Sequence, residues 1–399
     1  MKKSLFISLL TIPTILYAQV PLPYIEAQPP AEKTWEYFCK KVLEKGQPQK
    51  VFPPQELDVR TCDISSWDFT NYTADELADV LSFDSKTILP PATKLPKNFH
   101  PKKILENGKK PGLHIKRLHE KGIDGRGVSV AIIDQNLLTD HQEYKNNLTW
   151  YQEDEFWKKG EYSASMHGAA VASILVGKTV GVAPKASLFF LAEDFRNEGE
   201  FFDSTPIAMA LEHVAYINSQ LPKEMKIRVV SISRGFDFTD IGWDKLLEVK
   251  NKLEEQGVAV FATNDVQTLS RLHSSDNPDK VSSYCRPPYW WQKEEYADLA
   301  SNRALIVPTD FRTTAAPNGV GDYVHYANGG LSWAVPYVAG LYALGVQVYP
   351  NLTKEIFKDA WAKTASKQVC EFNNTPFKVE MLANPEKLIN YLKRLNTND

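Results

Sequence analysis

The sequence predicts an α/β fold, a doubly wound and mostly parallel β-sheet with helices on both faces, preceded by a small N-terminal region. Two observations lead to this prediction. From about residue 112 onward, short runs of β-branched and aromatic apolar residues alternate with longer amphipathic stretches. The runs are nearly continuous in apolar residues rather than alternating with polar ones, as strands buried on both faces of a parallel sheet are. Repeated alternation of strands and helices is typical of doubly wound domains.

The apolar runs predict strands at residues 128–133, 187–192, 227–233, 258–262 and 304–307. The stretches between and after them predict helices at residues 167–176, 205–219, 243–256, 333–348 and 353–365. We assign residues 112–399 to one domain, because single cores stop growing at roughly 250 to 300 residues.

Proline-containing segments at residues 21–30 and 89–101 mark a separate region before this domain, because proline resists regular packing. We assign the N-terminal region to residues 19–111. Within it we expect helices near residues 35–43 and 74–81.

The first 18 residues resemble a secretory signal peptide. Lys2 and Lys3 precede an apolar run at residues 5–16, and Ala18 is a small residue before the cleavage point. The run is shorter than the roughly 20 apolar residues of a spanning helix, and an uncleaved anchor is the alternative. We expect a secreted or periplasmic protein with no membrane span after signal cleavage.

The cysteines fit an exported protein, because disulfides persist in oxidising compartments. Cys39, Cys62, Cys285 and Cys370 allow three pairings. Proximity along the chain favours Cys39 with Cys62 and Cys285 with Cys370, and four free buried thiols are the alternative.

Composition excludes two classes of protein. With 43% hydrophobic and 24% charged residues, the chain is typical of globular rather than disordered proteins. Its net charge of -3 provides no basic surface, so no nucleic-acid partner is expected.

Three short blocks contain residues suited to nucleophilic chemistry. In the first, a glycine turn leads into an apolar strand that ends on Asp134, at the sheet edge where α/β proteins hold their active sites. In the second, His167 begins a helix of small residues. In the third, two glycines precede Ser332 at a helix start, where free amide groups favour negative charge. Each block alone also has a structural explanation, such as an ordinary helix cap.

In the order Asp, His, Ser, the blocks resemble the signature blocks of the subtilisin-like serine proteases, the subtilases or peptidase family S8. The resemblance covers about residues 112–365. It includes residues 181–184 downstream of His167 and residues 334–340 downstream of Ser332. It implies a subtilisin-like fold and a serine endopeptidase with Asp134, His167 and Ser332 as catalytic triad.

Further matches imply where a substrate would bind. The strand that ends at Asn264 resembles the one that supplies the family's oxyanion-hole asparagine. Ser233, Arg234 and Gly235 resemble the edge that pairs with an extended protein or peptide substrate. Arg234 has two interpretations, a contact for an acidic substrate side chain or a stem that lies along the pocket rim. The mechanism needs no cofactor.

Four departures from the family pattern lie beside these residues. Gln135 and Asn136 replace Thr-Gly, Ala169 and Leu331 each replace threonine, and Trp333 replaces methionine. They favour the rival interpretation, a catalytically silent subtilase fold that serves as a binding or scaffold protein. An esterase is disfavoured, because esterases usually have a Gly-x-Ser-x-Gly motif and another order of triad residues.

The sequence contains one residue that matches a calcium ligand of the family. Glu143 matches a calcium-ligating acid of the family, but residues 174–181 are too short for a ligand loop, so we predict no metal site.

Residues 19–111 lack the usual subtilase propeptide pattern. They are either a propeptide that acts as an intramolecular inhibitor or a retained accessory domain.

Overall fold

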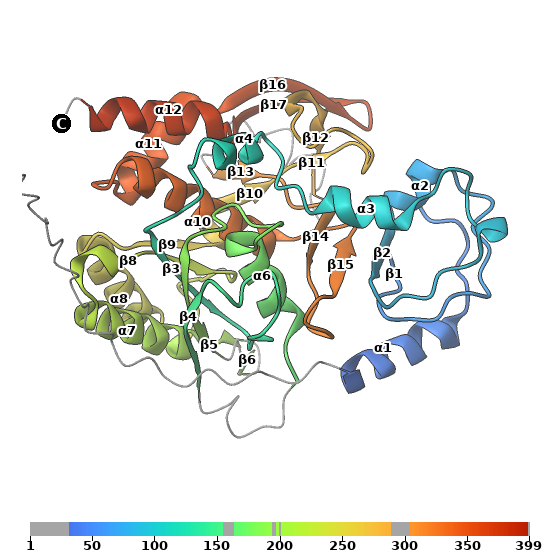
Figure 1. Cartoon of the computed structure of the whole chain (residues 1–399), viewed down its shortest axis with the longest axis horizontal. Helices are drawn as coiled ribbons and strands as arrows, with labels where there is room; N and C mark the ends of the chain where they lie inside the picture. Colours follow the sequence, from blue (N-terminus) through green and yellow to red (C-terminus); the bar gives the residue numbers. More distant parts are fainter. Residues whose placement is uncertain (1–31, 155–162, 194–196, 199–200, 289–303, 398–399) are drawn as a thin grey trace, which may run out of the picture.

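The computed structural model describes residues 32–154, 163–193, 197–198, 201–288 and 304–397 (Figure 1). The predicted signal peptide lies outside them. At the centre is a five-stranded parallel sheet in the order β4-β5-β3-β8-β9, which confirms the predicted fold class. Its strands are β3 (Ser129–Asp134), β4 (Leu148–Glu153), β5 (Ser187–Ala192), β8 (Ile227–Ile232) and β9 (Ala259–Ala262).

Helices cover both faces of this sheet, because successive residues of its strands point to opposite sides. Val130 and Ile132 of β3 join the hydrophobic cluster that contains α6 (Met166–Val176) and α10 (Leu331–Val348). Ala131 and Ile133 join the cluster of the opposite face, which contains α7 (Thr205–Gln220) and α8 (Trp243–Glu255). The predicted helices are therefore confirmed with boundaries that differ by one or two residues.

Helix α10 is the core helix of the molecule. By length and hydropathy it is the one helix of the described residues that could cross a membrane. However, 78% of its 18 residues are buried inside the protein. Such burial is typical of a core helix.

The predicted strand at residues 304–307 lies in a second sheet instead of the central one. After β9 the chain makes a 3-10 turn, η3 (Thr263–Asp265), and continues as β10 (Val266–Thr268). Because β13 (Leu305–Val307) pairs with β10, it joins the sheet β10-β13-β17-β16. The other strands of that sheet are β16 (Ser366–Phe372) and β17 (Thr375–Leu382).

The N-terminal region has its own hydrophobic cluster, within residues 57–99, and shares a sheet with the rest of the chain. In that sheet, β1-β2-β15-β14, strand β2 pairs with β15 (Figure 1). The strands are β1 (Leu57–Asp58), β2 (Leu81–Asp84), β14 (Arg312–Ala315) and β15 (Tyr323–Tyr326). The helices are α1 (Glu32–Lys45), α2 (Ala74–Ala78), η1 (Ala92–Lys94) and α3 (Pro101–Gly108), so both expected helices are present. The division at residue 111 stays a prediction.

The favoured disulfide pairing is confirmed. Cys39 is bonded to Cys62, and Cys285 is bonded to Cys370. The first bond ties α1 to the loop after β1, and the second joins β12 (Tyr284–Arg286) to β16.

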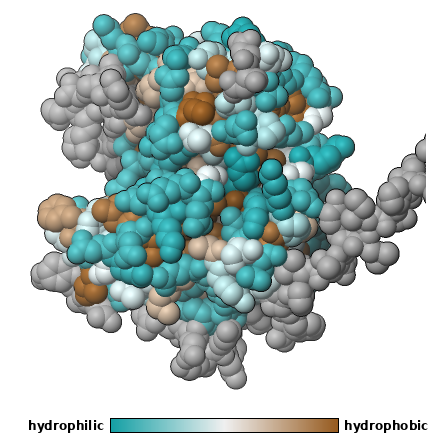
Figure 2. Space-filling model, turned by 90° about the vertical axis from the view of Figure 1, so that its left-hand side faces the viewer, coloured by the Kyte–Doolittle hydropathy of each residue, from teal (hydrophilic) through white to brown (hydrophobic). Residues whose placement is uncertain are grey.

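The remaining described elements are short strands and helices outside the three larger sheets. They are α4 (Ile115–Glu120), β6 (Asn197–Glu198), β7 (Phe201–Phe202), η2 (Lys223–Met225), β11 (Ser270–Arg271), η4 (Val281–Ser283), α11 (Lys354–Thr364) and α12 (Pro385–Asn396). Figure 2 shows one side of the molecule, where small hydrophobic patches are scattered over a mainly hydrophilic surface.

Candidate active site

Asp134 is the last residue of β3, the central strand of the parallel sheet, and is completely buried. Its Oδ1 accepts a hydrogen bond from the backbone N–H of Gln135 at 2.8 Å and lies 2.6 Å from His167 Nδ1. Its Oδ2 is buried without a hydrogen-bond partner among the described residues. The sequence-predicted acid and histidine therefore form a close pair.

Local contacts at the start of α6 hold His167 in place. The N-cap Ser165 accepts from the His167 backbone N–H at 3.0 Å and donates to the side chain of Gln135 at 2.6 Å. A Cβ atom at Gly168 would lie 2.4 Å from the carbonyl oxygen of Asn136, so only glycine lets the helix approach this closely. Gln135, a departure from the family pattern, thus connects the start of α6 to the segment that follows Asp134 by a hydrogen bond.

The environment of His167 favours its protonated form. Burial alone would lower the pKa, but the charge of Asp134 and its hydrogen bond raise the pKa above the ordinary value of 6.5. The hydrogen bond at Nδ1 leaves Nε2 as the nitrogen that can exchange a proton with a substrate or nucleophile.

Ser332 is the second residue of α10 and follows the N-cap Gly330. Its Oγ donates to the backbone carbonyl of Ser233 at 3.3 Å, and Ser233 Oγ donates to the Ser332 carbonyl at 2.9 Å. No hydrogen bond joins Ser332 to His167, although both are described and both line one cavity. The predicted nucleophile and the predicted base therefore line the same cavity, with the hydroxyl of Ser332 turned towards Ser233. Rotation about χ1 of Ser332 would be needed to turn this hydroxyl towards His167.

Asn264 lies in the η3 turn directly after β9 and is exposed. Two hydrogen bonds to the backbone of Phe236 fix its amide: Oδ1 accepts from the N–H at 2.8 Å and Nδ2 donates to the carbonyl at 3.0 Å. An amide carries two hydrogens on Nδ2, so one donor remains free. Asp265 anchors the turn through buried Lys354 at 3.2 Å, a support that sequence reasoning missed.

Ser233, Arg234 and Gly235 follow β8 at the carboxyl end of the sheet. The Arg234 guanidinium lies 4.7 Å from the ring centre of Phe202, and its Nη1 donates to the Asp203 carbonyl at 3.0 Å. The guanidinium is therefore packed and bonded, which favours the interpretation of Arg234 as part of the pocket rim.

A model of the subtilase family matches residues 125–288, the part of the chain that contains Asp134, His167, Asn264 and the Ser233 edge. This part of the chain is therefore similar to the subtilase family. Subtilisin-like protease 7 of Arthroderma otae is 27% identical over 246 residues, which cover 59% of this chain and 57% of that protein. Subtilisin-like protease 7 of Arthroderma benhamiae is 26% identical over 233 residues, which cover 56% of this chain and 54% of that protein.

The chain thus spans about half the length of the curated relatives it matches. Among solved structures, the PatG macrocyclase domain covers 70% of this chain and 95% of its own, with a TM-score of 0.50 and 13% sequence identity. At that identity, the likeness concerns the fold alone.

Protein donors surround Glu143, the acid that matches a calcium-ligating position of the similar family. Glu143 accepts hydrogen bonds from the Thr179 backbone at 2.8 Å, the Thr179 hydroxyl at 2.5 Å, the Val180 backbone at 3.3 Å and the Tyr323 hydroxyl at 2.5 Å. Burial alone would raise the pKa of Glu143, but these donors lower it below the ordinary value. The described residues contain no cluster of three potential metal ligands.

Three residues of the N-terminal region also line the cavity of Ser332 and His167, and sequence reasoning missed them. They are Glu56, Asp58 and Arg60, and the cavity has a volume of about 230 Å³. A signal was present, because these charged residues alternate with buried Leu57 and Val59, the period-two pattern of a strand with one polar face.

Proposed function

We propose that this chain is a secreted serine endopeptidase that hydrolyses peptide bonds through Asp134, His167 and Ser332. The observation that carries the proposal is the 2.6 Å contact between Asp134 and His167 in a cavity that Ser332 also lines. An acid, a histidine and a serine in this arrangement are the components of nucleophilic acyl transfer.

In the proposed mechanism, His167 Nε2 takes the proton of Ser332 Oγ, which attacks the carbonyl carbon of the substrate. Asp134 orients the imidazole and stabilises the imidazolium that forms. The developing oxyanion accepts hydrogen bonds from the Ser332 backbone N–H and the Asn264 amide. His167 then protonates the leaving amine, and water hydrolyses the acyl-enzyme by the reverse sequence of proton transfers. No step needs a cofactor.

Protein or peptide substrates would bind in an extended conformation along Ser233, Arg234 and Gly235. These residues continue β8 beyond the end of the sheet, where a substrate strand can pair with the backbone. The substrate would thereby place its scissile carbonyl between Ser332 and Asn264.

Export to an oxidising compartment is part of the proposal. Two disulfides support it, since cytosolic proteins rarely keep them. The signal-like residues 1–18 supply the route, and we place the mature protein outside the cell or in the periplasm.

A catalytically silent subtilase fold that binds peptides is the second candidate. It is favoured by the hydrogen bond of Ser332 Oγ to Ser233 rather than to His167, and by Leu331 where the family has threonine.

Labelling with a fluorophosphonate probe distinguishes the two candidates, because the probe reacts with an activated serine. We expect wild type to be labelled and to cleave peptides, and we expect Ser332→Ala and His167→Ala to lose both properties while they keep their circular dichroism spectra. Absence of labelling in folded wild type would support the silent binding protein, and peptidase activity in Ser332→Ala would refute the triad.

A further inference from the structure

The cavity of about 230 Å³ lies on one side of Ser332. His167 and Trp333 line it, whereas Asn264 and the edge at residues 233–235 do not. In acyl transfer the histidine gives its proton to the leaving amine, so the leaving group lies on the histidine side of the serine. The cavity is therefore positioned for the substrate residue that follows the scissile bond.

Residues of the N-terminal region form one wall of this cavity, and contacts just upstream of Ser332 fix that wall. Asn328 Nδ2 donates to the Pro54 carbonyl at 3.1 Å. Ser82 Oγ accepts from the Ala327 backbone N–H at 2.8 Å and forms a short hydrogen bond with Glu56. The wall is thus bonded to the segment that leads into α10.

Broader contacts make the N-terminal region a structural part of the peptidase. Strand β2 pairs with β15, and the carboxylate of buried Asp84 accepts from Asn318 Nδ2 at 3.1 Å. On the other side of the region, Asp79 lies 2.7 Å from His273 Nδ1 and accepts from the Ser274 backbone N–H at 2.7 Å. Removal of the region would expose the edge of β15 and leave these partners unpaired.

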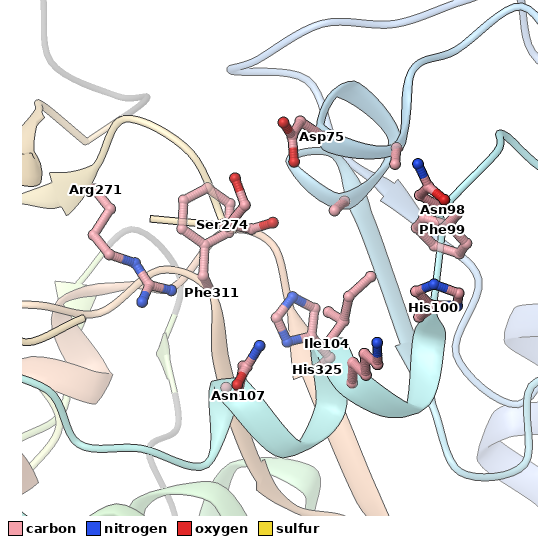
Figure 3. Close-up of a pocket in the computed structure, with 15 residues that line it drawn as sticks. Asp75, Asn98, Phe99, His100, Ile104, Asn107, Arg271, Ser274, Phe311 and His325 are labelled. Carbon is pink, nitrogen blue, oxygen red and sulfur yellow. The ribbon is translucent and has the colours of Figure 1, made fainter. Parts of the chain in front are cut away.

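Figure 3 shows the same junction from within a second cavity, of about 140 Å³, away from Ser332. His100, the N-cap residue of α3, and Ile104 and Asn107 within the helix line this cavity together with His325 and Phe311. At the end of α3 the packing is closer still, because a Cβ atom at Gly108 would lie 2.3 Å from Thr313 Oγ1 of β14. Helix α3 therefore packs directly on strands β14 and β15 of the shared sheet.

The charges of the wall leave one carboxylate for a substrate. Arg60 forms a bidentate ion pair with Asp58, at 2.7 Å and 2.5 Å, and also donates to the Tyr326 hydroxyl at 3.0 Å. These two charges neutralise each other. Glu56 lines the cavity and accepts a hydrogen bond from Ser82, and no ion pair holds it among the described residues. Burial raises the pKa of Glu56 to about 7, although the nearby Arg60 lowers it in part.

We propose that residues 54–60 form a substrate subsite on the leaving-group side of the scissile bond, and that Glu56 makes this subsite selective for a lysine or arginine side chain. The inference rests on the proposed function. It requires the N-terminal region to stay in the active enzyme, where it walls the cavity and leaves Ser332 and His167 accessible.

Quenched fluorescent peptides test the subsite. The best cleavage site in denatured casein defines one peptide, which is then made with lysine, norleucine or glutamate after the scissile bond. We expect wild type to prefer lysine over glutamate in kcat/KM on the order of tenfold, the effect of one hydrogen bond to a charged group. Norleucine, which has the stem without the charge, should fall between them.

Glu56→Gln should reduce the ratio of lysine to glutamate to less than threefold, whereas Glu44→Gln, a change on the exposed face of α1, should leave the ratio unchanged. Asp58→Asn, which removes the partner of Arg60, should also lower the ratio and covers the case in which Glu56→Gln does not fold.

The outcomes separate this inference from the proposed function. Fluorophosphonate labelling with equal rates for all three peptides, or with a Glu56→Gln ratio equal to that of wild type, would overturn the subsite alone. Failure of wild type to label would overturn the proposed function and the subsite together.

Discussion

At the scale of single residues, Asn264 and Leu331 determine how the proposed oxyanion is held. Leu331 stands beside Ser332 where the family has a threonine hydroxyl, so the Asn264 amide and the Ser332 backbone N–H are the remaining donors. One Nδ2 hydrogen of Asn264 is engaged by the Phe236 carbonyl, which orients the amide before a substrate binds. Preorganised donors of this kind stabilise the transition state more than the ground state.

We therefore expect Asn264→Leu to lower kcat by about 10² or more, with little change in KM. Asn264→Asp is the matched control for the contacts with Phe236, because it keeps the acceptor for the backbone N–H and lacks the donor. Leu331→Thr should leave kcat unchanged or raise it modestly. Near-normal kcat of Asn264→Leu on a peptide substrate would show that Asn264 is not the oxyanion donor.

The pH dependence of activity follows from the environment of His167. The general base must be neutral, and Asp134 raises the pKa of His167 above 6.5 despite burial. We expect the acid limb of the kcat/KM profile to have its midpoint above pH 6.5. A midpoint at or below this value would contradict the pairing of His167 with Asp134.

The raised pKa of His167 also makes the stability of the fold depend on pH: protonation, which stops activity, stabilises the folded state. A pKa raised by folding means that the folded state binds the proton more tightly. The protonated pair therefore stabilises the fold fully below the unfolded pKa, and this contribution disappears as the pH rises through the folded pKa.

At the scale of elements, the close approach of α6 to the end of β3 sets the geometry of the site. Gly168 permits this approach, because any side chain there would meet the carbonyl oxygens of Gln135 and Asn136. The packing of the whole helix α6 against the segment after β3 therefore sets the position of His167 relative to Asp134.

We expect Gly168→Ala to push α6 away from Asp134 and to lower kcat by on the order of 10², the typical consequence of a displacement near 1 Å. Ala170→Gly, in the same helix, should cost about 0.5–1 kcal/mol of stability with a smaller change in kcat. Peptide hydrolysis and thermal unfolding measure both effects. Equal kcat values for the two variants would show that the approach of α6 is not critical.

The connection after α6 donates hydrogen bonds to the carboxylate of Glu143. The carboxylate of Glu143 is bonded to Thr179, Val180 and Tyr323, so it already has the donors that a cation would replace. We expect EDTA to lower the Tm only slightly, and Glu143→Gln to lower the free energy of unfolding by about 1–3 kcal/mol through unpaired donors. A large drop of Tm in EDTA that calcium restores would reveal a site at another place.

At the scale of the whole molecule, the N-terminal region and the peptidase share a sheet, an ion pair and the wall of a cavity. Strand β2 in particular covers the edge of β15, the strand that precedes Ser332. Loss of this region would therefore affect both solubility and the active site.

We expect the purified active enzyme to contain residues 32–111, so that after export the masses of wild type and Ser332→Ala differ only by the oxygen atom that the substitution removes. Intact mass spectrometry and N-terminal sequencing measure this directly. A wild type that is shortened through residue 111 while Ser332→Ala stays long would instead identify the region as a propeptide.

The sequence by itself determined the fold class and the order of the main helices and central strands along the chain, whereas it only favoured the disulfide pairing that the structure contains. The fold class and this order follow from local patterns, because fully buried parallel strands are nearly continuous in apolar residues and helices begin at capping residues. The three blocks around Asp134, His167 and Ser332 were also visible, since Asp134 ends an apolar strand and His167 and Ser332 begin helices beside small residues. Strands β4, β14 and β15 were missed, because partly polar edge strands and short hairpins lack a continuous apolar run.

Only the tertiary structure decided which residues meet. It placed β13 in a second sheet, because pairing depends on where β10 emerges after the turn at Asn264. It also brought Glu56 to the cavity of Ser332, although hundreds of residues separate them along the chain. Contacts between distant segments arise from sheet pairing and core packing, which no local pattern encodes, and the composition of the cavity therefore became known only when the chain was folded.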